Sequence, residues 1–123
     1  MNWRDLVLGG AGVLGAAVAI FHGVITQQLM VRPVEAVYGS GVMRRIVPGL
    51  LQFSTYNWFL GGLALVAAAA GLAPGGRLAI AVLVGSSYLF GALGNLWATR
   101  ARHPGGWLYA AAVAMIAVGA YRP

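Results

Sequence analysis

The length of its charge-free apolar runs constrains this chain more than any other feature. Residues 6–29 include no Asp, Glu, Lys or Arg. As a helix rising 1.5 Å per residue, this run would reach about 36 Å, enough to cross a hydrocarbon layer of about 30 Å with some tilt. Three further apolar runs follow over residues 48–72, 78–99 and 106–121. Each run is a candidate membrane span, and the last is the shortest.

Composition points in the same direction. Of the 123 residues, 60% are hydrophobic and only 8% are charged, whereas an average soluble domain is about 25% charged. Such a chain has too little polar surface to coat a water-soluble globule, which excludes a cytosolic enzyme domain and a disordered tail. The absence of Cys excludes a disulfide scaffold and a Cys-ligated metal site.

The runs do not alternate in polarity, as the strands of a membrane barrel would. Only a helix satisfies an unbroken apolar backbone in lipid. We therefore expect an all-α protein, a four-transmembrane-helix bundle in up-down order, with residues 1–123 forming a single integral membrane domain.

The first run has a second interpretation, a cleaved signal peptide. Arg4 precedes it, and Ala17-Val18-Ala19 fits a small-residue cleavage site. The apolar run continues beyond that site through Phe21 and Ile25, which favours a retained span.

The connections between the runs are short. Residues 73–77 are expected to form a tight turn and residues 100–105 a loop. Only residues 31–47 leave room for structure of their own. There, Pro33 can start a short helix that Gly39 ends, with Val34, Val37 and Tyr38 on one face. We expect an interfacial helix lying on the membrane, with an irregular loop as the alternative.

All eight basic residues are Arg, and each falls at the end of an apolar run, where it can meet lipid headgroups. This placement is typical of charges that set topology, and it does not form the clustered face of a nucleic-acid-binding protein. The residues expected at the interface near the first and third loops are Arg32, Arg44, Arg45, Arg100, Arg102 and Trp107, against Arg4, Arg77 and Arg122 on the opposite side. Five Arg against three predict cytoplasmic first and third loops, and termini on the outer side of the cell inner (plasma) membrane.

Polar side chains inside the runs gather in the half of the predicted bilayer near the first and third loops. Gln52, Thr55 and Tyr56, for example, share one helix face at i, i+3 and i+4. Two interpretations remain open: hydrogen bonds between helices that fix packing, or a small polar cavity for a headgroup or solute. The candidate residues are His22, Thr26, Gln52, Thr55, Tyr56, Tyr88, Asn95 and Tyr109.

His22 is the only ionisable group expected inside a span, so it is a candidate for a proton relay or ligand contact as well as for packing. Metal binding is not expected, because His22 and His103 are predicted at different depths and the two acids, Asp5 and Glu35, outside the spans. The same shortage of paired titratable groups argues against an enzyme and against a cofactor.

Small residues recur every four positions in the first run, at Ala11, Gly15, Ala19 and Gly23. Shorter stripes of the same kind occur in the third and fourth runs. This spacing lets helix backbones approach closely, and it predicts a tight bundle.

The sequence also resembles a group of small, uncharacterised bacterial four-span proteins. The resemblance is carried by His22-Gly23, Arg32-Pro33 and the segment from Gln52 to Trp58. That group has a Glu where this chain has Gln28, and Trp-His where it has Gln52-Phe53. The resemblance therefore implies a four-span fold and the loss of any metal or proton site those groups form.

These observations predict a small membrane protein without catalytic chemistry. We expect an accessory or assembly subunit, or a module that binds lipid, another membrane protein or a second copy of itself. The alternative is a small transporter or channel-like oligomer that uses the polar residues around His22. Proton-coupled drug export of the small multidrug-resistance type is disfavoured, because the first run lacks the Glu on which that family depends.

Overall fold

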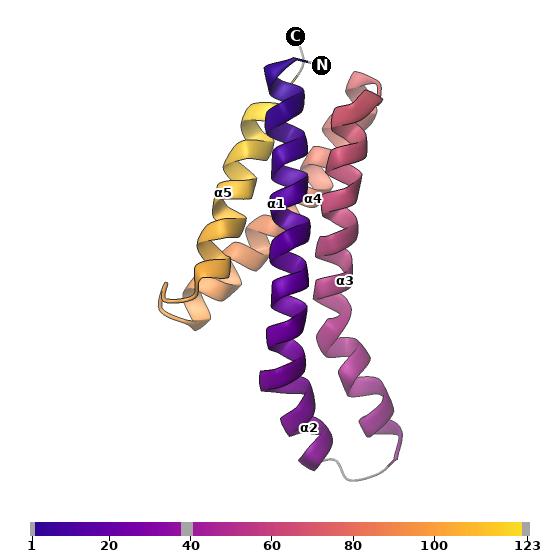
Figure 1. Cartoon of the computed structure of the whole chain (residues 1–123), viewed down its shortest axis with the longest axis vertical. Coiled ribbons are helices and arrows are strands. Elements are labelled where there is room, and N and C mark those ends of the chain that lie inside the picture. The colour runs from indigo at the N-terminus through magenta and orange to yellow at the C-terminus, as the bar shows by residue number, and fades with distance from the viewer. Residues whose placement is uncertain (1, 38–40, 122–123) are drawn as a thin grey trace.

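The computed structural model describes residues 2–37 and 41–121, and the described chain is helical almost throughout. Four main helices form an all-α bundle: α1 (Trp3–Thr26), α3 (Val42–Gly71), α4 (Pro74–Ala98) and α5 (Pro104–Gly119). They run alternately up and down, so that both ends of the chain lie at the same end of the bundle (Figure 1). The expected helical bundle is confirmed.

The helices begin where their capping residues require. α1 starts with a capping box, in which the Asn2 side chain accepts from the Asp5 backbone N–H and the Asp5 carboxylate accepts from the Asn2 backbone N–H. α4 and α5 start at Pro74 and Pro104, because proline at the first helical position loses no internal hydrogen bond.

Two predicted boundaries are wrong. The expected turn at 73–77 is reduced to the link before Pro74, because the helix starts at that proline, and Arg77 therefore lies in the first turn of α4. α3 begins at Val42, six residues before the expected start, and carries Pro48 inside it.

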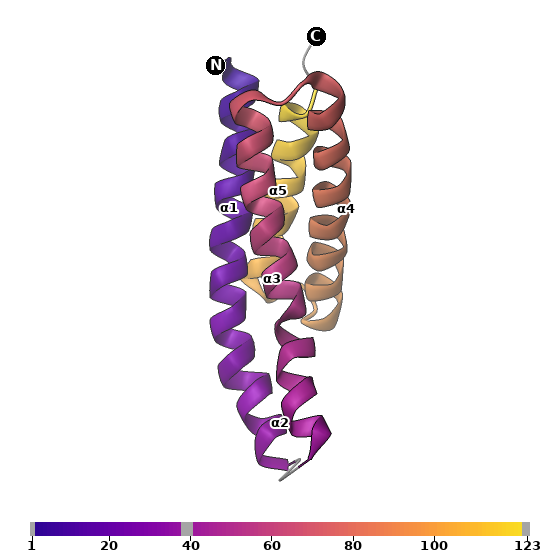
Figure 2. The same ribbon diagram turned by 90° about the vertical axis from the view of Figure 1, so that its right-hand side faces the viewer.

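The expectation of a separate interfacial helix is also wrong. A π-helical turn, η1 (Gln27–Val31), follows α1 without a break, and α2 (Arg32–Val37) follows η1. These segments prolong α1 instead of lying across its end (Figure 2). The expected contributions of Tyr38 and Gly39 lie outside the described residues.

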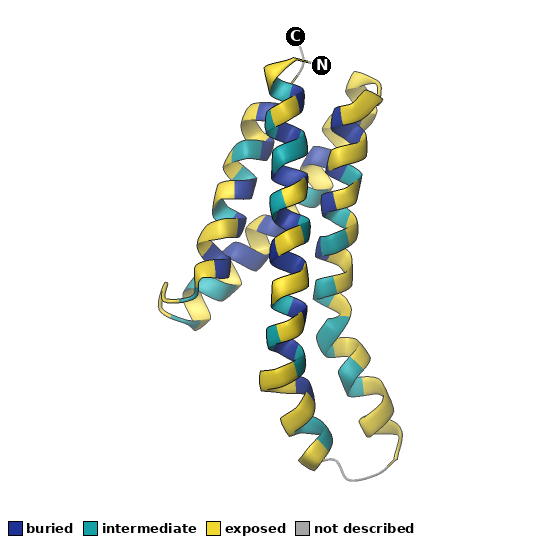
Figure 3. Ribbon diagram, viewed as in Figure 1, coloured by how far each residue is buried: buried dark blue, intermediate teal, exposed yellow. Residues whose placement is uncertain are grey.

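α1 is the centre of the packing. It makes its most extensive contact with α3 and also packs on α5, while α4 packs on α5 and only weakly on α3. Buried residues form narrow stripes on the facing sides of the helices, and the outward faces are largely exposed (Figure 3). The stripe predicted at Ala11, Gly15, Ala19 and Gly23 is buried, as expected.

The backbones of α1 and α3 come very close at Gly12 and Gly62. A Cβ added to either glycine would lie 2.5 Å from the carbonyl oxygen of the other. Because both obstacles are backbone atoms, no side-chain rearrangement relieves the overlap. The α1–α3 contact therefore requires glycine at both positions.

We expect Gly62→Ala to lower the free energy of unfolding in detergent by about 1–3 kcal/mol, since the two helices must move apart. Gly94→Ala is the matched control, because Gly94 also lies inside a helix but a Cβ there meets nothing within 4 Å. The control is expected to be neutral or stabilising by up to about 1 kcal/mol through helix propensity. Equal destabilisation by both changes would contradict the role of the close contact.

Candidate functional site

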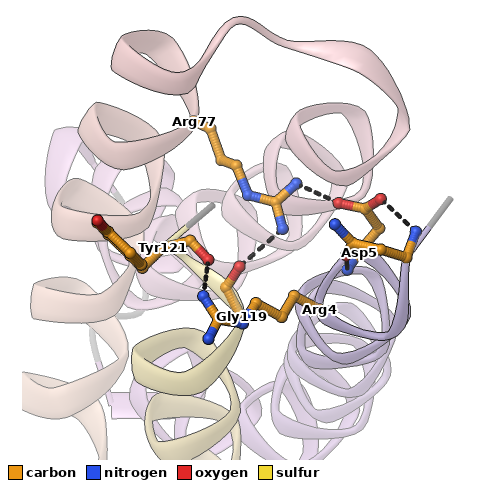
Figure 4. A network of polar contacts seen from close by, with 6 residues as sticks. Arg4, Asp5, Arg77, Gly119 and Tyr121 are labelled. Atoms are coloured by element: carbon orange, nitrogen blue, oxygen red, sulfur yellow. Dashed lines mark hydrogen bonds and ion pairs between the residues drawn. The ribbon is translucent and has the colours of Figure 1, made fainter. Parts of the chain in front are cut away.

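The most highly charged site in the interior joins the ends of three helices. The Arg77 guanidinium, from α4, lies 2.7 Å from the Asp5 carboxylate of α1, and both side chains are fully buried. Its second terminal nitrogen donates to the carbonyl oxygen of Gly119 at the end of α5, at 2.7 Å. We call these three residues the terminal ion-pair network (Figure 4).

Each contact satisfies a group that would otherwise be costly to bury. The Gly119 carbonyl belongs to the last turn of α5, where carbonyls lack intrahelical partners. Asp5 lies in the first turn of α1, where the helix dipole favours a negative charge. Arg77 Nε is buried without a hydrogen-bond partner among the described residues. Beside the network, the Arg4 side chain donates to the Tyr121 carbonyl oxygen at 2.9 Å.

Two expectations are therefore wrong. Arg77 does not meet solvent or headgroups, since it is 0% exposed, and Asp5, expected before a first span that starts at residue 6, lies buried within α1. Two sequence signals could have located the pair. Asn2 and Asp5 have capping-box spacing, and Pro74 marks a helix start that places Arg77 in its first turn.

A second cluster, the aromatic layer, takes one ring from each main helix: His22, Trp58, Tyr88 and Tyr109. Their ring centroids form a chain, with 4.9 Å from His22 to Trp58, 4.8 Å from Trp58 to Tyr109 and 4.8 Å from Tyr109 to Tyr88. These separations and tilted geometries are favourable for aromatic pairs. The layer therefore ties all four helices together.

Glycines make room for these rings. A Cβ at Gly15 would overlap the Tyr88 ring, and a Cβ at Gly91 would lie 2.6 Å from the Trp58 indole. The small-residue stripes thus serve ring packing as well as backbone approach. The Tyr88 hydroxyl donates to the Trp58 carbonyl oxygen at 2.8 Å, whereas the buried Tyr109 hydroxyl has no partner among the described residues.

The remaining predicted polar residues do not converge on one site. Gln52 bridges α3 to α1, donating to the Gly23 carbonyl oxygen at 3.0 Å and to the Gln27 side-chain oxygen at 3.2 Å. Thr26 is buried, and the buried Thr55 hydroxyl, beside Gly23, has no partner among the described residues. Tyr56 is 62% exposed and points away from this group.

Asn95 and both histidines line one small space with Tyr109. Its volume is about 10 Å³, which is about the minimum for one water molecule. His22 and His103 therefore lie at the same level, and the expectation of different depths is wrong. His103 caps α5, with Nδ1 accepting from the Gly105 N–H at 3.1 Å. Asn95 donates within its own helix, to the Gly91 carbonyl oxygen at 2.8 Å.

The His103 cap has a chemical consequence for metal binding. A neutral imidazole whose Nδ1 accepts a hydrogen bond carries its proton on Nε2, so neither nitrogen offers a free lone pair. Among the described residues, no group of three or more His, Cys, Asp or Glu side chains could hold a metal ion.

The predicted interfacial residues lie at two different levels. Arg100, Arg102 and Trp107 are exposed at the α4–α5 connection, where the Trp107 indole donates to the Ala101 carbonyl oxygen at 3.1 Å. Arg32, Arg44 and Arg45 are exposed on the prolonged ends of α1 and α3. These ends extend well beyond the α4–α5 connection (Figure 1).

Comparison with known proteins adds no relative: no protein family, curated protein or solved structure matches this chain. The resemblance to small bacterial four-span proteins therefore stays a prediction.

We expect Arg77→Met to cost about 3–5 kcal/mol of unfolding free energy, because it leaves the Asp5 carboxylate buried without its counter-charge. In the double variant Asp5→Asn/Arg77→Met, much of this loss should return, since no charge is then buried. Thermal unfolding of all four combinations in detergent measures the coupling. Strictly additive effects would show that the ion pair does not act as a unit.

The two tyrosines of the aromatic layer form a matched pair. Tyr88→Phe removes a buried hydrogen bond and is expected to cost about 1 kcal/mol. Tyr109→Phe removes a buried hydroxyl without a protein partner and is expected to be neutral or slightly stabilising. Chemical unfolding in detergent compares them, and a larger loss for Tyr109→Phe would contradict the assignment.

Proposed function

We propose that this chain is a small integral membrane protein that acts as an accessory or assembly subunit, binding lipid or another membrane protein and performing no catalysis. The proposal rests on one observation above all: two belts of aromatic and Arg side chains whose separation matches the thickness of a bilayer.

The first belt surrounds the chain ends, where Trp3 and Tyr121 are exposed and Arg4 donates to the Tyr121 backbone. The second surrounds the α4–α5 connection and includes Trp97, Trp107 and Arg100. Because His103 of that connection shares a small space with His22, the second belt lies level with His22 on α1. From Trp3 to His22, α1 rises about 28 Å, close to the hydrocarbon thickness of about 30 Å. Aromatic and basic residues are typical of both membrane interfaces.

The surface between the belts supports the same proposal. Large apolar side chains are exposed on every main helix. Examples are Val13, Leu60, Leu83 and Val118. α1 with its extension, α3 and α4 are each long and apolar enough to cross a membrane, and α5 is a shorter apolar helix. In water, so large an apolar exterior would lead to aggregation.

The buried ion pair strengthens the proposed orientation. Arg77 is neutralised by Asp5 inside the bundle and does not count as a loop charge. The first and third connections in the sequence then carry five Arg, against Arg4 and Arg122 next to the chain ends. We infer that these two connections face the cytoplasm and that both termini lie on the outer side of a plasma (inner) membrane.

The interior supports binding better than transport. The space around His22 is about 10 Å³, too small for a solute passage. Larger spaces lie on the outside of the bundle, among them a groove of about 460 Å³ between α4 and α5 and one of about 440 Å³ between α3 and α4. Grooves of this kind can accept acyl chains or the side chains of a neighbouring helix. The transporter alternative has no comparable observation in its favour.

Single cysteines test the membrane placement, because the chain has no native Cys. In lipid nanodiscs, Leu83→Cys on the outer face of α4 is expected to resist a membrane-impermeant maleimide and to react after denaturation. Gly76→Cys, exposed at the start of α4, is the control and is expected to react at once. Rapid labelling of Leu83→Cys in intact nanodiscs would overturn the proposal.

A further inference from the structure

The two longest helical segments continue past the four-helix part of the molecule. We call residues 23–37 and 42–52 the α1–α3 arm. It is seen below the ends of α4 and α5 in both views (Figures 1 and 2). The inference drawn from it depends on the proposed function, because it takes the bilayer to end near the second aromatic belt.

The arm is too long to be an ordinary headgroup anchor. The α4–α5 connection lies level with His22, and 15 residues follow His22 to the end of α2. At 1.5 Å per residue, these reach about 22 Å beyond the belt. The polar headgroup zone adds only about 5–8 Å on each side of the hydrocarbon. Most of the arm therefore stands in the aqueous phase.

The two sides of the arm are held together by specific contacts. Gln52 of α3 donates to Gly23 and Gln27 of the first side, at 3.0 and 3.2 Å. Val31 is 1% exposed between the two sides. These contacts make the base of the arm a defined two-helix element with a fixed register.

The outer surface of the arm is unusually apolar for a segment in water. Leu29 is 71% exposed and Met43 is 51% exposed, and further large apolar side chains lie exposed around them. Those further residues are Met30, Val37, Val42 and Ile46. Two helices bury apolar side chains only on the faces they turn toward each other. The remaining faces require a partner.

Charge defines the chemistry of that partner. The arm carries three exposed Arg, at 32, 44 and 45, and a single acid, Glu35. Arg32 lies ten residues past His22, or about 15 Å past the belt, which is beyond the reach of the headgroups. Arg45 lies seven residues further out than Gln52 along α3. The partner must therefore offer acidic groups in water together with an apolar face.

We propose that the α1–α3 arm is a docking site outside the bilayer for an acidic amphipathic helix of another protein. Such a helix lays its apolar face against the arm and its carboxylates against the Arg side chains, as in helix-in-groove recognition. A second copy of this chain fits less well, since two arms brought together would join two surfaces that are each rich in Arg.

The binding experiment uses the full chain in phosphatidylcholine nanodiscs. The probe is a fluorescent synthetic helix with Leu on one face and Glu on the other, and the matched peptide has Lys in place of Glu. Fluorescence anisotropy is expected to show binding of the Glu peptide, with neither the Lys peptide nor protein-free nanodiscs giving a comparable signal. Equal binding of the two peptides would overturn the proposal.

Paired variants locate the binding. Arg32→Gln/Arg45→Gln is expected to lower the affinity for the Glu peptide by about tenfold, because two charge pairs are lost. Leu29→Ser/Met43→Ser is expected to weaken binding of the Glu peptide at least about tenfold, and since both side chains are exposed the fold should persist. The control Arg100→Gln/Arg102→Gln removes the same charge outside the arm and is expected to change affinity less than about threefold. Equal losses in the two Arg pairs would contradict docking on the arm.

Cysteine labelling separates this inference from the proposed function. Gln28→Cys on the arm is expected to react with the impermeant maleimide in nanodiscs and to be protected by the Glu peptide. If Gln28→Cys is protected by lipid alone while Leu83→Cys is also protected, the protein spans the membrane but the arm lies within it, and the docking proposal fails. Efficient disulfide dimers of Gln28→Cys would identify a second copy as the occupant and would likewise overturn it.

Discussion

The buried ion pair between Asp5 and Arg77 determines how the ends of three helices come together. Removing two charges from water is costly, and the cost is offset only when each charge meets a close partner in good geometry. Arg77 meets both the Asp5 carboxylate and the Gly119 carbonyl, so that α1, α4 and α5 hold a fixed relation at the end of the bundle. The side chains that complete this site come from positions far apart in the sequence.

Below that end, packing depends on size more than on polarity. Gly12 and Gly62 let α1 and α3 approach until their backbones almost touch, while Gly15 and Gly91 receive aromatic rings. Among the described residues, the resulting interior leaves little space around His22. Contact with other molecules is therefore expected on outer surfaces, which is why the proposed function is one of binding.

We propose a functional reason for the unequal lengths of the helices. Four helices share a common height of about 28 Å along α1, and two of them continue as the arm. A protein that served only to cross a bilayer would not need this extension. The arm is tied together at its base by Gln52 and leaves large apolar and Arg side chains unburied. Together, these features favour a membrane-anchored docking element over an isolated bundle.

The sequence predicted the helical class and the four main helices, because unbroken apolar runs permit only a helix where water is absent. It also predicted that the stripe from Ala11 to Gly23 would be buried. It misplaced the helix start at Pro74, and with it Arg77, because the Gly-rich segment reads locally as a turn. It gave no sign that Trp58 would join His22, Tyr88 and Tyr109 in one layer.

By itself, then, the sequence determined periodicity, helix length and the excess of apolar side chains, which are properties of neighbouring residues. Tertiary structure alone decided which polar groups meet. The Arg77 contact with Asp5 spans 72 residues, and the common level of His22 and His103 depends on where α5 begins beside α1. Such relations follow from helix lengths, crossing angles and close backbone contacts acting together, so they cannot be predicted from a local sequence pattern.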